Sequence, residues 1–140
     1  MSVEFCDTDV VVYAYDTTAG AKHLHARQLL ERLWIDGVGA ASIQVLQELF
    51  VTLTRKIPRP ADTTTARGIT SDLATWRIVR PTEVDVLAAI DATVRWKISF
   101  WDAMILTAAQ GTGASVVWSE DLGANQTFDG VTVRNPFDTT

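Results

Sequence analysis

Short apolar runs alternate along this chain with segments whose apolar residues recur at helical spacing. The apolar runs predict five strands: Val3–Cys6, Gly37–Ala41, Trp76–Val79, Ser115–Trp118 and Val131–Val133. The helical spacing predicts a short helix after Asp9 and five more: His23–Trp34, Ile43–Ile57, Asp62–Leu73, Glu83–Trp96 and Trp101–Gln110. Strands that alternate with helices form βαβ units and a parallel sheet covered on both faces. We therefore expect an α/β protein with three layers, α/β/α, around a central parallel β-sheet.

The length and composition of the chain limit its class. At 140 residues we expect one domain, residues 1–140, with a real core. The single cysteine, Cys6, excludes an internal disulfide framework and a cysteine-rich zinc site. The N-terminus lacks the pattern of a signal peptide, and no apolar stretch reaches the roughly 20 residues that span a bilayer. The expected location is therefore cytoplasmic, without a membrane partner.

Four acidic residues occur where a parallel sheet would bring them together. Asp7 follows the first strand, Asp121 follows the strand that ends at Trp118, Asp102 opens an apolar helix, and Glu48 lies within the helix Ile43–Ile57. Strand carboxyl ends and the starts of the following helices share one edge of such a sheet, where sites form. Gathered carboxylates repel one another, and Mg²⁺ or Mn²⁺ accepts such hard oxygen ligands. This pattern favours metal-assisted hydrolysis of a phosphate ester or phosphodiester.

Each of these acidic residues also has a simpler structural interpretation. Asp7 and Asp9 fit a turn or an N-cap pair, and Asp102 fits a capping box that begins at Ser99. Glu48 falls on an ordinary solvent-exposed helix stripe, and Asp121 fits a strand-to-helix turn. Their recurrence at one predicted edge favours the functional interpretation, because a carboxylate in apolar surroundings needs a partner, a proton or a cation.

The charge balance bears on the class of substrate. The net charge of -5 argues against a protein that coats nucleic acid, but not against an enzyme that cuts RNA. The densest basic stretch is Arg55–Arg59, which contains Lys56. It fits two interpretations: phosphate binding beside the site, or cations at the end of a helix before a proline stop.

Four short motifs contain the acidic residues Asp7, Glu48, Asp102 and Asp121, in that order. They read FCDTDVVVYA, SIQVLQEL, FWDAMI and VWSEDL, and they span essentially the whole chain. Together they resemble the motifs of PIN-domain ribonucleases, and the short chain most resembles VapC-type toxins of bacterial toxin–antitoxin pairs. One position departs from the family pattern, because Asp9 stands where the family often has asparagine. Glu48 is included among the candidate site residues because of this resemblance, since its helical position alone does not single it out.

The resemblance implies a PIN-like fold and a metal-dependent endoribonuclease. Asp7, Glu48, Asp102 and Asp121 would be the catalytic and metal-binding carboxylates, with Mg²⁺ or Mn²⁺ as cofactor. We expect Thr8 and Ser119 to orient carboxylates by hydrogen bonds, and Asp9 to support the site. Whether Asp9 or Glu120 is itself a ligand stays open. The implied partners are an RNA substrate, a cognate antitoxin protein and a second copy of the chain in a homodimer.

Two rival functions remain open from the sequence. Asp7 and Asp9 after an apolar strand also resemble the first motif of haloacid-dehalogenase-type phosphatases, with Asp7 as nucleophile and Asp9 as general acid. Such enzymes need a lysine before a final acidic pair, and Lys97 is the nearest available. The other rival is a non-catalytic binding module that keeps the PIN fold.

The helical patterns also predict which residues form the core. In Glu83–Trp96, Val84, Leu87, Ala88 and Val94 are expected to face inward, with Ile90 as a further candidate. The tryptophans are expected mostly in the core, among them Trp34 and Trp118. The helices His23–Trp34 and Ile43–Ile57 carry more apolar residues than one core stripe requires, so a docking groove for an inhibitor is expected there.

Overall fold

The computed structural model describes residues 2–138. The strands are β1 (Glu4–Cys6), β2 (Gly39–Ser42), β3 (Arg77–Val79), β4 (Val116–Trp118), β5 (Thr127–Phe128) and β6 (Val131–Arg134). The α-helices are α1 (Thr8–Tyr15), α2 (Ala21–Asp36), α3 (Ile43–Arg55), α4 (Thr63–Leu73), α5 (Glu83–Trp96) and α6 (Phe100–Gly111), with a 3-10 turn, η1 (Thr17–Ala19). The predicted alternation of strands and helices is confirmed, with most ends shifted by one or two residues.

The strands form one sheet in the order β3-β2-β1-β4-β6-β5. Four neighbouring pairs are parallel, and β5 alone runs antiparallel, in a hairpin with β6. Strand β5 was not predicted, because two residues are too few to show a period of two. Since β1, β2 and β4 are parallel, their carboxyl ends reach the same edge of the sheet.

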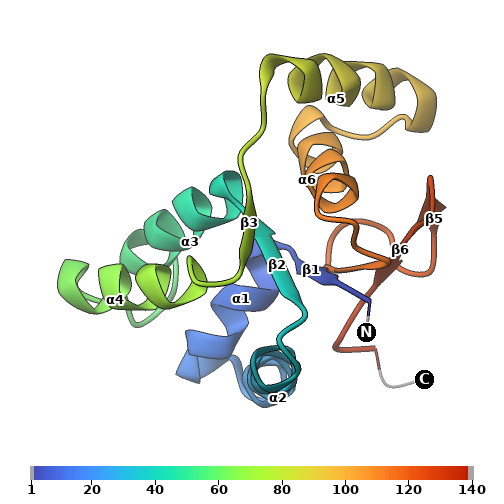
Figure 1. The fold of residues 1–140 in the computed structure, drawn as a ribbon. Coiled ribbons are helices and arrows are strands. Elements are labelled where there is room, and N and C mark those ends of the chain that lie inside the picture. The colour runs from blue at the N-terminus through green and yellow to red at the C-terminus, as the bar shows by residue number, and fades with distance from the viewer. Residues whose placement is uncertain (1, 139–140) are drawn as a thin grey trace.

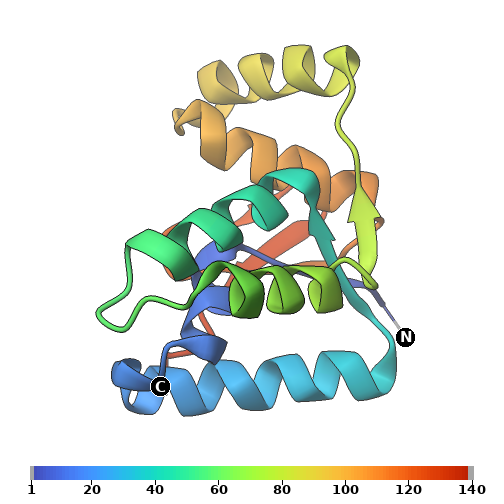
Figure 2. The ribbon, with the colours of Figure 1, turned by 90° about the vertical axis from the view of Figure 1, so that its left-hand side faces the viewer.

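The helices cover both faces of the sheet, as predicted. Helices α1 to α4 gather on one side, whereas α6 lies on the other side and α5 packs outside α6 (Figure 1). The view turned by 90° shows α3 leaving the end of β2 and running outward, with α6 above it (Figure 2). The three-layer α/β/α fold is therefore confirmed.

Local interactions explain where the elements begin. Ser42 caps α3, because its hydroxyl accepts a hydrogen bond of 3.3 Å from the backbone N–H of Val45. Gly39 opens β2 where the ring of Trp76 lies so near that an added Cβ would come within 2.7 Å of it. The centre of the sheet is dry, since Phe5, Cys6 and Val117 are fully buried. Cys6 is thus a buried residue of the core.

The predicted inward face of α5 is wrong. Its buried residues are Ala89 and Ala92, which allow α5 to pack closely on α6. The predicted core residues are exposed instead: Val84, Leu87, Ala88, Ile90 and Val94. Both sides of this helix carry apolar residues, so spacing alone did not decide which side would pack. We call Val84, Leu87, Ile90 and Val94 the apolar face of α5.

The tryptophans are less buried than expected. Trp34 is 38% exposed and Trp101 is 64% exposed, whereas Trp76, Trp96 and Trp118 are half-buried. Trp34 stands edge-on to Trp76 with ring centroids 5.0 Å apart, so it covers the rim of the core. Between residues 2 and 138, no helix combines the length and apolar character required to cross a membrane.

Candidate active site

Asp7 lies at the carboxyl end of β1 and caps α1. Its Oδ1 accepts a hydrogen bond of 2.7 Å from the backbone N–H of Thr8, and its Oδ2 accepts one of 2.9 Å from the hydroxyl of Ser119. Its own N–H donates to the carbonyl of Trp118 in the neighbouring strand, at 2.9 Å. The carboxylate is therefore fixed between two strands. The predicted orienting contact is present for Ser119, whereas Thr8 contributes its backbone N–H instead of its hydroxyl.

The hydroxyl of Thr8 is a buried polar group without a hydrogen-bond partner among the described residues. Thr8 is only 7% exposed and directly follows Asp7. A buried hydroxyl that lacks a partner costs free energy, so its position beside the carboxylates is consistent with a bound group that contacts it.

Asp9 lies one residue further into α1 and faces the same edge. Its Oδ1 accepts from the N–H of Val10 at 2.7 Å, and its Oδ2 accepts from the N–H of Glu120 at 3.0 Å. The Ser119–Glu120 segment thus contacts both Asp7 and Asp9, with a hydroxyl on one and a backbone N–H on the other. The segment after β4 orients two carboxylates that are far from it in the sequence.

Glu48 and Asp102 approach Asp7 from the helices on the two sides of the sheet. Glu48 lies on the exposed side of α3, and Asp102 is half-buried in the first turn of α6. The negative charges of both residues act on Asp7. The backbone N–H of Asp102 donates to the hydroxyl of Ser99 at 3.1 Å, so Ser99, not Asp102, caps α6.

Asp121 lies beside Asp9 and Glu120, and not in the group that Asp7 forms with Glu48 and Asp102. Carboxylate oxygens of Asp9, Glu120 and Asp121 lie within 4.8 Å of one another. Asp7 thus has Glu48 and Asp102 as neighbours, whereas Asp121 groups with Asp9 and Glu120. We call these six carboxylates the acidic edge: Asp7, Asp9, Glu48, Asp102, Glu120 and Asp121.

The two aspartates of α1 have raised pKa values. Burial raises the pKa of Asp7 to about 6, and the charges of Glu48 and Asp102 add to this, against the hydrogen bonds from Ser119 and Thr8. Burial likewise raises the pKa of Asp9 to about 7, with the charges of Asp7 and Asp121 adding to it. Within residues 2–138 neither aspartate has a cationic partner, so the fold disfavours their charged forms.

Glu120 is the acidic residue of this edge that the protein does neutralise. Lys22 of α2 forms an ion pair with one of its oxygens, and the hydroxyl of Tyr13 donates to the other at 2.9 Å. The ammonium of Lys22 also lies 5.2 Å from the centroid of the Tyr13 ring. Nothing in the sequence indicated that Glu120 would be held by these two residues, because Lys22 is far from it along the chain.

The donor set fits a divalent cation. Among residues 2–138, the carboxylates of Glu48, Asp102 and Asp121 have no ion pair and no hydrogen-bond donor. Several negatively charged oxygens at one half-buried edge are the hard ligands that Mg²⁺ and Mn²⁺ take. Asp7, Asp9, Glu48, Asp102 and Asp121 lie along this edge together with Glu120, whose role as a ligand the sequence left open.

The fold is shared with several solved toxin structures. A toxin–antitoxin complex from Klebsiella pneumoniae is 19% identical, with 98% of this chain and 99% of that chain covered and a TM-score of 0.68. Mycobacterium tuberculosis VapC20, a toxin that cleaves the sarcin-ricin loop, is 22% identical over 84% of this chain and 89% of its own, with a TM-score of 0.64. DNA-bound VapBC from Salmonella typhimurium is 16% identical over 97% and 99%, with a TM-score of 0.66.

Sequence comparison identifies the family. A search of curated proteins found no match for this sequence. The family model described as the PIN domain matches residues 5–127, which include all six carboxylates of the acidic edge. The haloacid-dehalogenase alternative has no support from these comparisons. By sequence motifs, sheet order and family match together, this chain belongs to the PIN-domain family.

Proposed function

We propose that this protein is an Mg²⁺- or Mn²⁺-dependent endoribonuclease and the toxin of a VapC-type toxin–antitoxin pair. The observation that carries the proposal is the Asp7 carboxylate, which is held by Ser119 and Thr8 and flanked by the uncompensated charges of Glu48 and Asp102. The toxins with the same fold, one of which cleaves RNA in the sarcin-ricin loop, support the choice of RNA as substrate.

In this mechanism the chain supplies oriented oxygen ligands. Asp7, Glu48, Asp102 and Asp121 would hold the cation directly or through water, and Asp9 and Ser119 would support them. A divalent cation bound there supplies a water of lowered pKa and stabilises charge on the scissile phosphate. Hydrolysis by in-line attack would leave a 5′-phosphate and a 3′-hydroxyl. The Ser119 hydroxyl keeps Asp7 turned toward the edge in its charged form.

The direct test is RNA cleavage by the purified chain in Mn²⁺, compared with the same reaction in EDTA. Cleavage should require the cation and disappear in Asp7→Asn, while Asp91→Asn on the exposed surface of α5 keeps it. Cation binding by the wild type without any RNA cleavage would contradict the nuclease and favour a non-catalytic binding module.

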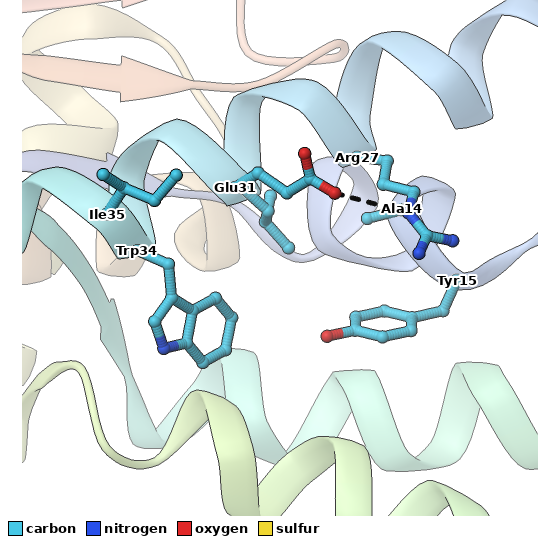
Figure 3. Close-up of a pocket in the computed structure, with 7 residues that line it drawn as sticks. Ala14, Tyr15, Arg27, Glu31, Trp34 and Ile35 are labelled. Atoms are coloured by element: carbon cyan, nitrogen blue, oxygen red, sulfur yellow. Dashed lines mark ion pairs between the residues drawn. The ribbon is translucent and has the colours of Figure 1, made fainter.

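A cognate antitoxin is the second part of the proposal. A pocket of about 320 Å³ lies along α2 and the end of α1, lined by Ala14, Tyr15, Arg27, Leu30, Glu31, Trp34 and Ile35 (Figure 3). The apolar side chains of Trp34 and Ile35 stand beside the ion pair of Arg27 and Glu31, whose closest atoms are 3.7 Å apart. Such a mixture suits an amphipathic segment of a partner protein.

The position of the antitoxin groove stays a prediction. The helix His23–Trp34 lines this pocket together with the end of α1, and a separate groove lies on α3. We propose that an antitoxin segment occupies this pocket and extends a basic side chain to the acidic edge. Arginine fits that role best, because its planar group pairs with two carboxylate oxygens at once.

The homodimer remains part of the proposal. The apolar face of α5 includes Leu87, 61% exposed, and Val94, 78% exposed. In an antiparallel pair of α5 helices, Glu83 and Asp85 near the start of one would lie opposite Arg95 near the end of the other. This charge complementarity and the exposed apolar surface both favour a second copy of the chain on α5.

A further inference from the structure

A groove on α3 begins at a carboxylate of the acidic edge and ends at a cation. Its volume is about 220 Å³, and its lining residues are Gln47, Glu48, Val51, Thr52 and Lys56. Glu48 and Lys56 are eight positions apart, which corresponds to roughly 12 Å along a helix that rises about 1.5 Å per residue. The groove therefore connects the acidic edge with the outer end of α3, which Figure 2 shows leading into the loop before α4.

The cations at this end of the groove have no acidic partner. Arg55, Lys56 and Arg59 are exposed and form no ion pair within residues 2–138. Lys22, Arg27, Arg32 and Arg95 pair with carboxylates, whereas the remaining cations of the described residues, which are scattered singly along the chain, do not. The basic stretch is thus a local positive surface on a protein whose net charge is -5.

Stabilisation of the helix end does not account for all of these cations. Arg55 lies in the last turn of α3 and Lys56 is its C-cap, where positive charge favours the helix dipole. Arg59 lies beyond the helix, between Pro58 and Pro60, where the dipole no longer acts. The two prolines restrict the backbone around Arg59, so this side chain projects from a stiff segment.

We propose that the α3 groove from Glu48 to Lys56, together with Arg59, binds the sugar-phosphate backbone of single-stranded RNA and leads it to the acidic edge. The inference rests on the proposed nuclease function. An acidic protein repels a polyanion, so a substrate strand needs local cations to approach carboxylates. Thr52 and Gln47 offer hydrogen bonds to phosphate or ribose, and Val51, 43% exposed, offers apolar contact.

The test measures RNA binding without cleavage. In an Asp7→Asn background, the Kd of a labelled 20-nucleotide single-stranded RNA is measured by fluorescence anisotropy over a series of KCl concentrations. Adding Lys56→Gln and Arg59→Gln should weaken binding about tenfold or more at low salt. The slope of log Kd against log salt should fall by about 1.4, because each lost phosphate contact on a single strand accounts for about 0.7.

The matched control changes the net charge by the same amount elsewhere. Arg67 is exposed on α4, and Arg77 lies at the amino end of β3, on the opposite edge of the sheet. Replacement of both by Gln should leave the Kd within about twofold of the parent. The salt slope should stay within about 0.3 of the parent, because neither residue is expected to contact a phosphate. A Lys56→Arg, Arg59→Lys exchange keeps both charges and should keep binding. Thermal unfolding confirms that each variant is folded.

The outcomes separate the path of the strand from the function itself. If both double variants lost the same RNA affinity, the effect would be due to net charge alone, and the proposed binding role of the groove would be wrong. Unchanged binding in the α3 variant would mean that the strand takes another path, although the parent still binds RNA. Absence of RNA binding by the parent, together with absence of cleavage by the wild type, would contradict the proposed nuclease and the groove at once.

Discussion

The hydroxyl of Ser119 donates a hydrogen bond of 2.9 Å to Oδ2 of Asp7 and so links the segment after β4 to the end of β1. This bond favours the charged form of Asp7, whereas burial and the charges of Glu48 and Asp102 oppose it. Ser119 is fully buried, so the bond is not exchanged for water. We therefore expect Ser119 to influence cation binding through Asp7 without touching the cation itself.

Ser119→Ala should weaken cation binding. Without its donor, the charged form of Asp7 loses about 1.5 kcal/mol or more of stabilisation, so the pKa of Asp7 rises further and Mn²⁺ affinity at neutral pH falls about tenfold. Isothermal titration with Mn²⁺ measures the effect. Ser71→Ala, at an exposed position of α4, is the control and should bind as the wild type does. Equal affinities for all three proteins would remove Ser119 from the site.

Asp7→Asn should abolish RNA cleavage and leave the fold intact. Asparagine keeps the shape of the side chain but lacks the negative charge that the cation requires. Because the change also removes repulsion from Glu48 and Asp102, the melting temperature without cation should stay equal or rise slightly. Cleavage assays and thermal unfolding are the two measurements. Activity within a few-fold of the wild type would disprove the assignment of Asp7.

The cation-free protein should lose stability as pH rises from about 4 to about 7. Asp7 and Asp9 have a pKa near 3.8 when unfolded, and in the fold their pKa values are about 6 and about 7. Folding therefore favours their protonated forms, so their contribution to stability is present at low pH and disappears as pH rises through the folded pKa values. The loss should be on the order of a few kcal/mol.

Urea unfolding in EDTA at a series of pH values measures this dependence. The Asp7→Asn, Asp9→Asn double variant should show a flatter profile over the same range, because it lacks both titrating groups. Mn²⁺ should raise the stability of the wild type at pH 7, since a ligand that binds only the folded state stabilises it. Stability that rises with pH between 4 and 7 in the absence of cation would contradict the raised pKa values.

Ile35→Glu should prevent antitoxin binding. Ile35 is 84% exposed beside the pocket on α2, and a charge there opposes the burial of an apolar partner segment. The measurement is co-purification with the antitoxin candidate encoded by a neighbouring short gene, and Ile35→Leu should retain the partner. Full binding by Ile35→Glu would place the antitoxin elsewhere. A complex that cleaves RNA at the full rate would exclude blockade of the acidic edge.

Leu87→Glu should convert the protein to a monomer. A charge at the centre of the apolar face of α5 would be buried unpaired between two copies, which costs several kcal/mol. Light scattering after size-exclusion chromatography measures the molar mass. Ile35→Glu serves as the reciprocal control, because it should lose the antitoxin and keep the dimer. A wild-type protein that is monomeric at micromolar concentration would contradict the role proposed for α5.

The alternation of strands and helices was predictable from the sequence, apart from β5. The sequence placed Asp7, Asp102 and Asp121 at one edge, and the family motif placed Glu48 there. In the structure Asp7 neighbours Glu48 and Asp102, whereas Asp121 neighbours Asp9 and Glu120. Parallel topology makes this possible, because strand carboxyl ends share an edge whatever the details of packing. The prediction that residues 1–140 form one domain, and the catalytic roles of these carboxylates, remain predictions. The spacing of apolar residues was sufficient to predict most helices and strands, because the helical and strand periods each repeat within a few residues.

Tertiary structure alone decided how the edge is built. Glu120 is neutralised by Lys22 and Tyr13, and Asp9 is held by the backbone of Glu120, through contacts between residues about 100 positions apart. Burial by those distant segments sets the pKa of Asp9, so no local pattern reveals it. The same holds for α5, whose buried side is set by the close approach of α6 to small residues and not by the hydrophobicity of either face.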